Sequence, residues 1–367
     1  MSQASRDTDV ADHGAFWNSP EDRIRSVASA LGFDVAGFAK AEPTERTRFL
    51  QEWVDRGYSG EMHYIDRRLE ERIDPRLVLP GARSIIVLGL WTQAVAEKDS
   101  ESGPLGRIAR YAGGDDYHDV MLDRIRALES ALPALVEQRV ASRSYVDTGP
   151  VAERAAAVAA GLGWIGKNSC LIHPEWGSHL MLGVILTDLD LEADAEVTDH
   201  CGTCRACLDI CPTNAFPEPY VLDATRCISY TTIEDRGPIP QDLRQAQGEH
   251  VFGCDLCQSV CPWNQSRPKL LPSDPLGLRT RLTQRPEWIQ PTLAWLLSLT
   301  QEQFDRASRK TAIRRTGWQG LLRNALIAAG NSGDPSLIPV ITRHARSDDE
   351  LLSEHARWAL DQIEAGQ

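Results

Sequence analysis

Long apolar runs are missing from this sequence of 367 residues. The longest, Ser84–Trp91, has only the length of a strand, whereas a membrane-spanning helix needs about 20 apolar residues. The first 20 residues are polar and unpatterned, and they do not resemble a secretory signal peptide. We therefore expect a cytoplasmic protein with no membrane span and with a disordered tail over residues 1–20.

Positive charge is also scarce, because 39 Lys and Arg stand against 52 Asp and Glu, for a net charge of -13. This balance argues against indiscriminate binding to nucleic acids. Screening by salt confines such arguments to roughly 8 Å, so a local basic face can still exist. Residues 265–288 and 304–324 are net positive and form a candidate phosphate-binding face, with a solvated helix face as the alternative.

Cysteines are few but concentrated, since eight of the nine lie between Cys201 and Cys261. The first four are separated by two, two and three residues, and a proline follows them. This is the bacterial ferredoxin pattern, in which three thiolates bind one [4Fe–4S] cluster and the fourth binds the other. The second half departs from the pattern, because Val251 stands where its first cysteine would fall. Cys227 is the unassigned cysteine that can replace it.

The spacing thus predicts two [4Fe–4S] clusters. The predicted ligands are Cys201, Cys204, Cys207 and Cys261 for cluster one, and Cys211, Cys227, Cys254 and Cys257 for cluster two. Zinc is one alternative, but it usually takes two well-separated Cys-x2-Cys pairs. Disulfides are another, but they need an oxidising compartment. The ninth cysteine, Cys170, lies in an apolar run and is predicted to be a buried core thiol.

The hydrophobic pattern predicts an α+β protein in three parts. Residues 21–190 alternate strands with helices, which indicates an α/β or α+β sandwich around a sheet. A ferredoxin-like segment follows over residues 191–290. Residues 291–367 are helical only and resemble a HEAT-type repeat, which must pack on the main body. The individual elements predicted in the first part are helices over 21–31 and 151–160 and strands over 84–90, 144–147 and 179–187.

Two features outside the cysteines indicate more than an electron carrier. Asp147 follows a predicted strand and precedes a turn and a helix, which is where α/β sheets present catalytic groups. The alternative role for Asp147 is that of a helix cap. The glycine-rich run Ala160–Asn168 allows a close approach of the backbone and places Lys167 beside it, although this lysine could also be a surface charge. A plain ferredoxin-type carrier would leave both features without a role.

Together these residues resemble the epoxyqueuosine reductases, a family of cobalamin-dependent iron–sulfur enzymes of tRNA modification. The resemblance runs from about residue 20 to residue 360 and includes the cysteine framework. The other motifs are GEMHY (60–64), ARYAGGDDYH (109–118), VDTGPVAER (146–154), AGLGWIGKN (160–168), CISYTTIE (227–234), GCDLCQSVCPWN (253–264) and TAIRRTGWQGLLRNALIAAGN (311–331).

The resemblance implies a reaction, the reduction of epoxyqueuosine to queuosine at the wobble position of tRNA, which is the last step of queuosine biosynthesis. Electrons from an external low-potential donor would pass through the two clusters to base-off cobalamin. The sequence has no Asp-x-His-x-x-Gly motif, the signal for a histidine ligand below cobalt. Asp147 would donate a proton to the leaving oxygen, which requires a pKa raised by burial against the corrin.

The resemblance also implies site residues. The expected cobalamin contacts are Tyr64, Tyr111, Asp147, Lys167, Ser229, Tyr230, Cys254 and Asp255. The expected tRNA contacts are Arg154, Arg281, Arg314 and Arg315. A corrinoid-dependent reductive dehalogenase would share the cofactors, but that class usually carries a twin-arginine signal and has no need of a basic helical tail. Nothing in the chain demands more than a monomer.

Overall fold

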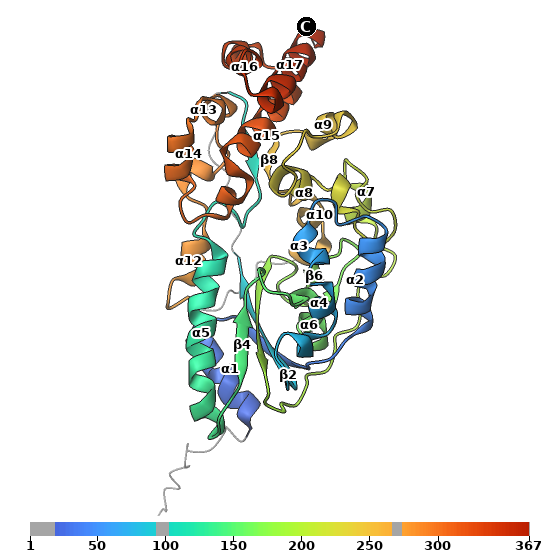
Figure 1. Ribbon diagram of the computed structural model, residues 1–367, viewed down its shortest axis with the longest axis vertical. Coiled ribbons are helices and arrows are strands. Elements are labelled where there is room, and N and C mark those ends of the chain that lie inside the picture. The colour runs from blue at the N-terminus through green and yellow to red at the C-terminus, as the bar shows by residue number, and fades with distance from the viewer. Residues whose placement is uncertain (1–18, 93–102, 266–273, 367) are drawn as a thin grey trace, which may run out of the picture.

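A four-stranded antiparallel sheet organises the N-terminal half of the protein. The computed structural model describes residues 19–92, 103–265 and 274–366 (Figure 1). The strands lie in the order β1 (Val35–Lys40), β2 (Ser84–Trp91), β7 (Leu180–Thr187) and β4 (Ser142–Tyr145), and each pairs antiparallel with its neighbour. The sheet is therefore that of an α+β fold, because an α/β fold requires parallel strands.

Side chains that alternate along β2 divide the interior into two cores. Ile86 and Leu88 pack with helices α1 (Pro20–Ala30) and α5 (Tyr117–Val136) on one face of the sheet. Ile85 and Val87 pack on the other face with α6 (Glu153–Ala159). Figure 1 shows α1 and α5 on one side of the sheet and α6 on the other. Because both faces are covered, β2 is apolar throughout, as its sequence predicted.

Most predicted elements of this half are confirmed to within two residues, namely α1, β2, β7 and α6. Residues 1–18 of the predicted tail lie outside the described residues. Residues 19 and 20 do not belong to a tail, because Ser19 is the N-cap of α1 and Pro20 is its first residue. The predicted strand 144–147 is displaced, since β4 ends at Tyr145. Asp147 has a φ of 56°, which no strand accommodates, and the chain turns at this point before α6 begins.

The cysteine-rich segment contains only short elements. These are α7 (Ala206–Asp209), α8 (Ile228–Ile233), α9 (Gln241–Gln247), β8 (His250–Phe252), α10 (Leu256–Ser259) and α11 (Pro262–Gln265). β8 pairs in parallel with β3 (Arg107–Ile108), which ties the segment to the first half of the chain. Further on, α12 (Leu278–Leu282) places Leu278 and Leu282 in the core shared by α1 and α5.

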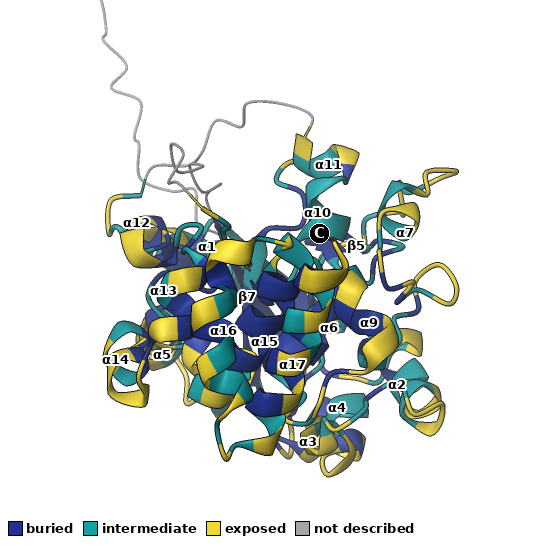
Figure 2. Ribbon diagram, turned by 90° about the horizontal axis from the view of Figure 1, so that it is seen from above, coloured by how far each residue is buried: buried dark blue, intermediate teal, exposed yellow. Residues whose placement is uncertain are grey.

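Helices alone form the C-terminal end. They are α13 (Leu293–Ser298), α14 (Gln301–Ala307), α15 (Gly317–Ser332), α16 (Ile338–Ala345) and α17 (Glu350–Ala365). α15 lies in the middle and is buried along most of its length, as its dark colour in Figure 2 shows. The hydrophobic core around α15 includes Val251 and Phe252 of β8. The C-terminal helices therefore pack on the cysteine-rich segment, which confirms the prediction that they pack on the main body. Within the described ranges, no helix has the length and apolar character of a membrane span.

Two polar residues of α15 bind the cysteine-rich segment to these helices. Arg323 is fully buried and donates hydrogen bonds to the carbonyl oxygens of Thr231, Asp235 and Gly237, at 2.6, 2.9 and 2.6 Å. Asn324, also fully buried, donates to the carbonyl oxygens of Thr232 at 2.8 Å and Val251 at 2.9 Å. Buried carbonyl groups need such partners, and the end of α8 is thereby fixed against α15.

Asn324→Leu should lower the free energy of unfolding by about 2 kcal/mol, because a leucine of similar size cannot donate to the buried Val251 carbonyl oxygen and leaves the Thr232 carbonyl oxygen with only its bond from Thr316 Oγ1. Gln319→Ala is the matched control on the same helix, since Gln319 is exposed and bonds the half-buried Asp349. The control should change the free energy by less than about 0.5 kcal/mol. Urea unfolding of both variants measures the difference, and equal changes would contradict the role given to Asn324.

Candidate functional site

A cavity of about 2170 Å³ lies between the sheet, the cysteine-rich segment and the C-terminal helices. Ordinary small-molecule pockets hold roughly 300–1,000 Å³, so this one has room for a large cofactor and part of a substrate. One wall comes from helices α2 (Glu45–Asp55) to α4 (Leu69–Ile73), the start of α5 and the loop that leads into α6. The opposite wall comes from residues 220–236 and 310–315.

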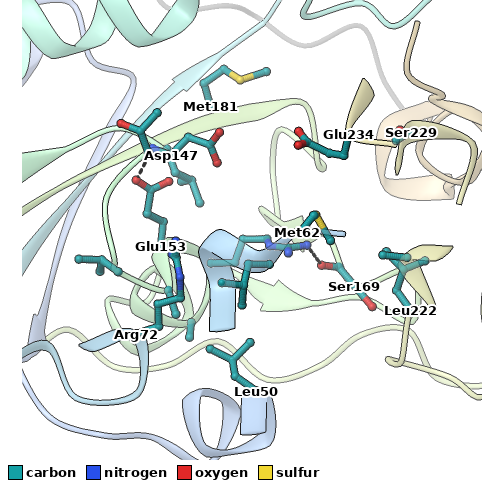
Figure 3. Close-up of a pocket in the computed structure, with 18 of the residues that line it drawn as sticks. Leu50, Met62, Arg72, Asp147, Glu153, Ser169, Met181, Leu222, Ser229 and Glu234 are labelled. Carbon is teal, nitrogen blue, oxygen red and sulfur yellow. Dashed lines mark hydrogen bonds between the residues drawn. The ribbon is translucent and has the colours of Figure 1, made fainter. Parts of the chain in front are cut away.

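Asp147 lies in the loop between β4 and α6, and its backbone is held in an uncommon conformation. Its φ of 56° is in the left-handed region, and the Thr148 N–H bonds the Val146 carbonyl oxygen at 2.6 Å across it. The Asp147 N–H donates to Oε1 of Glu153 at 2.6 Å (Figure 3). The Asp147 side chain is 63% exposed, and this exposure is to the cavity. The carboxylate is therefore open to a ligand deep inside the molecule.

The first turn of α5 brings two donors to this carboxylate. The Tyr117 hydroxyl donates to Oδ2 of Asp147 at 3.0 Å, and Nε2 of His118 lies 3.2 Å from the same oxygen. On its other side, Nδ1 of His118 lies 2.6 Å from Oδ1 of Asp116, which also caps the helix. The His118 imidazole thus sits between two carboxylates. The Asp-Tyr-His sequence lies in a motif noted above, but neither Tyr117 nor His118 was predicted as a site residue.

The proton of this group resides on His118. Burial alone would lower the pKa of His118, but the hydrogen bonds and charges of Asp116 and Asp147 raise it to about 9. Burial alone would raise the pKa of Asp147, but His118 and Tyr117 together bring it below its usual value. In this structure the pKa of Asp147 is therefore lowered, and the rise expected from burial against the corrin stays a prediction. The partners of Asp147 stabilise the ionised carboxylate by more than burial destabilises it.

The predicted cobalamin contacts divide into two sets. Those that line the cavity are Tyr64, Tyr111, Asp147, Ser229 and Tyr230. Those that do not are Lys167, Cys254 and Asp255. Lys167 lies elsewhere, because its Nζ donates to the carbonyl oxygens of Gly202 at 2.6 Å and Cys204 at 2.9 Å.

Cys254 and Asp255 lie directly behind the cavity wall. The Cys254 N–H donates to Oγ of Ser229 at 3.1 Å, so a lining residue holds this cysteine loop in place. Oδ2 of Asp255 accepts the Arg110 N–H at 2.8 Å, and burial raises the pKa of Asp255. The two residues thus support the wall rather than form its surface.

The structure brings the eight clustered thiols together in two groups. Burial and the charges of Cys201, Cys261 and Cys204 raise the pKa of Cys207 to about 11, so these four thiols are neighbours. Burial and neighbours that include Cys227 and Cys211 raise the pKa of Cys254 to about 12. Cys257 adjoins Cys227 and Cys254 in the second group. Cys227 itself lines the cavity, so the second group reaches its wall.

Two further residues contact these groups of thiols, and the sequence did not predict either contact. Trp164 is almost completely buried beside Cys201, and its indole N–H approaches the Cys201 sulfur, where it opposes the rise in the thiol pKa that burial causes. A donor beside the sulfur favours the thiolate that a cluster requires, so the surroundings fit such a group. Cys170 hydrogen-bonds Cys257. The thiol predicted to be buried in the core is half-buried and a neighbour of the second group.

Three of the four arginines expected at tRNA line the cavity, namely Arg154, Arg314 and Arg315. Arg281 does not, and it pairs with Asp115 at 3.1 Å. Arg315 binds both carboxylate oxygens of Glu234, at 2.6 and 2.8 Å, and lies over the ring of Tyr64. Arg314 is less constrained than Arg315, because its side chain is 58% exposed and its guanidinium lies 3.9 Å from the Asp305 carboxylate. The part of the basic stretch over 266–273 lies outside the described residues.

Two family models match the chain. Residues 72–148 match the model described as Epoxyqueuosine reductase QueG, DUF1730, and residues 200–264 match the 4Fe-4S double cluster binding domain. Curated relatives named epoxyqueuosine reductase match most of the chain. The protein of Xanthomonas campestris pv. campestris is 38% identical over 93% of this chain and 95% of its own length. The Escherichia coli protein is 36% identical over 94% and 90%, and the Gloeobacter violaceus protein 44% over 85% and 96%.

Solved structures agree with this match. A crystal structure of epoxyqueuosine reductase with an epoxyqueuosine-modified tRNA-Tyr stem loop has a TM-score of 0.84 and 31% identity, and the match covers 93% of this chain and 89% of that one. The enzyme of Streptococcus thermophilus gives 0.83 and 31%, over 93% and 90%. The enzyme of Bacillus subtilis, described with its catalytic aspartate loop swung out of the active site, gives 0.83 and 30% over the same shares.

The position of His118 between two carboxylates predicts a titration well above the usual pKa of 6.5. NMR of the imidazole should give a pKa of about 9 in the wild type and a clearly lower value in Asp116→Asn. Because the pKa is raised on folding, the stabilisation from His118 is complete below about pH 6.5 and is lost as the pH rises through about 9. Identical titration curves for the two proteins would show that Asp116 does not act on the imidazole.

Proposed function

The chain belongs to the epoxyqueuosine reductase family, and we propose that it reduces the epoxide of epoxyqueuosine in tRNA to the alkene of queuosine. The observation that carries the proposal is the cavity itself, which has the Asp147 carboxylate on one wall and the second cysteine group on the other. Such a reduction consumes two electrons and two protons and releases the oxygen as water. The wall that carries Asp147 would supply a proton, and the wall that carries the second cysteine group would supply the electrons.

The chain's thiols would hold two [4Fe–4S] clusters, one at Cys201, Cys204, Cys207 and Cys261 and the other at Cys211, Cys227, Cys254 and Cys257. The cavity would hold cobalamin, against Tyr64, Tyr111, Ser229 and Tyr230. When bound, these cofactors supply low-potential electrons, one at a time, to the substrate carbon. Support comes from the grouping of the thiols and from the size of the cavity.

The electron path that we infer enters at the first cysteine group and ends at the cavity. Cys204 is exposed, so an external donor can approach the first group. Cys227 lines the cavity, and Ser229 holds the Cys254 loop behind the wall. Only the residues of the cavity wall then separate the second group from the space that cobalamin would occupy, which favours transfer between them.

The proton path begins at His118. The imidazolium lies 3.2 Å from Asp147, and the Asp147 carboxylate is open to the cavity. We infer that the proton passes from Nε2 of His118 to the Asp147 carboxyl and from there to the epoxide oxygen as the carbon–oxygen bond breaks. Asp147 is then the proton donor although its resting form is ionised, because its proton is stored on the neighbouring ring. The second proton enters from solvent.

The tRNA would bind at the rim formed by Arg154, Arg314 and Arg315, where exposed guanidinium groups can reach phosphates. The wobble nucleoside must leave its stack to enter the cavity. Arg281 lies outside the cavity and would contact the backbone further away. The solved relative with a modified stem loop supports a tRNA substrate.

Of the alternative functions, a ferredoxin-type carrier leaves the cavity and the Asp147 group without a role. A reductive dehalogenase is disfavoured by the family to which the chain belongs. We further propose that the protein acts as a cytoplasmic monomer and that residues 21–190, 191–290 and 291–367 form cobalamin-binding, ferredoxin-like and HEAT-like parts.

Asp147→Asn should retain both clusters and cobalamin but lose turnover by at least 100-fold, because the amide cannot pass on the proton. Asp123→Asn is the matched control, since Asp123 is an exposed aspartate of α5 that does not line the cavity. Iron, sulfide and corrin are measured per chain after anaerobic reconstitution, and conversion of epoxyqueuosine-containing tRNA is then followed. Wild-type turnover in Asp147→Asn would remove the proton-donor role. Iron uptake without corrin uptake by the wild type would favour the carrier.

Arg314→Ala should weaken tRNA binding several-fold and reduce the slope of log affinity against log salt by about 1, because one phosphate contact is lost. Arg343→Ala removes an exposed arginine on α16, away from the cavity, and should change neither quantity. Filter binding or fluorescence anisotropy over a range of salt concentrations measures both. Unaltered affinity and slope in Arg314→Ala would place the tRNA elsewhere.

A further inference from the structure

The Asp147 loop adopts a conformation that a non-glycine residue does not keep unaided. A φ of 56° and the bond from the Thr148 N–H to the Val146 carbonyl oxygen define a tight γ-turn around Asp147. Backbone conformations of this kind are unfavourable for residues other than glycine and persist only where the surroundings hold them. The turn aims the carboxylate at Tyr117 and His118, so whatever holds it also determines the geometry of the proton path.

Two side chains from different elements hold this turn. Glu153, the first residue of α6, accepts the Asp147 N–H at 2.6 Å. Arg72 of α4 donates from Nη1 to the Gly149 carbonyl oxygen at 2.9 Å. The two contacts hold the backbone at the Asp147 N–H, within the turn, and at the Gly149 carbonyl oxygen, just after it. Neither contact involves the Asp147 carboxylate. Figure 3 shows Glu153 and Arg72 on the same side of the cavity as Asp147.

The packing on both sides of Asp147 anchors the chain as well, in addition to the contacts of Tyr117 and His118 with the carboxylate. Val146 is buried on one side of Asp147, which anchors the incoming chain. On the other side, Gly149 lies so close to the Tyr145 ring that a Cβ there would be 2.3 Å from Cγ of the tyrosine. Only a glycine therefore fits beside the Tyr145 ring, and Arg72 binds the carbonyl oxygen of this glycine.

We propose that Glu153 and Arg72 are positioning residues that form a latch on the backbone of the Asp147 turn and keep the carboxylate in the cavity. The consequence for catalysis rests on the proposed function, whereas the latch rests on the contacts alone. Neither residue needs to touch the substrate for this role.

The electrostatics of Glu153 suit such a latch. Burial and the neighbouring Asp147 raise the pKa of Glu153 well above its usual value. A neutral carboxyl keeps its carbonyl oxygen as an acceptor for the Asp147 N–H and avoids a second negative charge beside the Asp147 carboxylate. Glutamine has the same acceptor oxygen and is neutral at every pH, so Glu153→Gln is the conservative replacement and Glu153→Ala is the disruptive one.

Hydrogen–deuterium exchange of the reconstituted holoenzyme without tRNA tests the latch directly. In Glu153→Ala the Asp147 amide should exchange at least tenfold faster than in the wild type, while Glu153→Gln stays within threefold. The amides of β2 serve as the control for an intact fold and should not change in either variant. An unchanged exchange rate at Asp147 in Glu153→Ala would overturn the latch.

Kinetics test its consequence. Glu153→Ala and Arg72→Met should each lower kcat by about 10- to 100-fold, because a small displacement of a catalytic group has effects of this size. KM for the tRNA should stay within twofold, and Glu153→Gln should retain kcat within threefold. The double variant Arg72→Met/Glu153→Ala should lose less than the product of the two single losses, since both residues act on one turn.

The outcomes separate the possible failures. A Glu153→Gln enzyme as slow as Glu153→Ala would show that the acid group itself is required, which overturns a purely positioning role. Faster exchange with unchanged kcat in Glu153→Ala would overturn the catalytic consequence. A wild-type holoenzyme that does not convert epoxyqueuosine-containing tRNA would contradict the proposed function, and the exchange rates would still decide whether the latch exists.

Discussion

The hydrogen bonds from Arg323 and Asn324 to α8 and its flanks are the contacts on which the arrangement of the site depends. They replace solvent for a set of buried carbonyl groups, so α8 cannot shift without leaving some of them unpaired. The same short helix begins at the residue after Cys227 and carries Ser229 and Tyr230 into the cavity wall. A C-terminal helix bundle thus fixes the distance between the second cysteine group and the cavity. The bundle therefore positions the cavity wall that contains Cys227, Ser229 and Tyr230, and it also adds stability.

The opposite wall has a different origin, because it is built on the sheet. β4 ends just before Asp147, and α5 begins at the two residues that bind its carboxylate. The Asp147 group and the second cysteine group therefore lie on opposite walls of the cavity, and the pairing of β3 with β8 joins the two parts of the molecule that carry them.

The sequence predicted those features whose cause is local. The cysteine spacing, with Cys227 assigned by elimination, predicted two sets of thiols, and thiols of each set are neighbours in the structure. The two ligand sets themselves stay predictions. The apolar run of β2 was sufficient for a strand covered on both faces. Lys167 and Arg281 do not line the cavity, and their partners, the carbonyl oxygen of Cys204 and the carboxylate of Asp115, come from distant parts of the chain that the sequence did not reveal. The contacts predicted for these two residues stay predictions. His118 was missed because 29 residues separate it from Asp147.

The protonation of the site shows why burial alone is a poor guide. Asp147 and Glu153 line one cavity, and Oε1 of Glu153 accepts the backbone N–H of Asp147, yet the pKa values of the two carboxyl groups move in opposite directions. Asp147 faces a hydroxyl donor and an imidazolium, so its charged form is stabilised. Glu153 faces the negative charge of Asp147 and receives a single backbone donor, so its neutral form is preferred. One negative charge and one stored proton then lie side by side at this carboxylate. The proton that Asp147 would pass on does not have to be drawn from solvent, because it is already held 3.2 Å away.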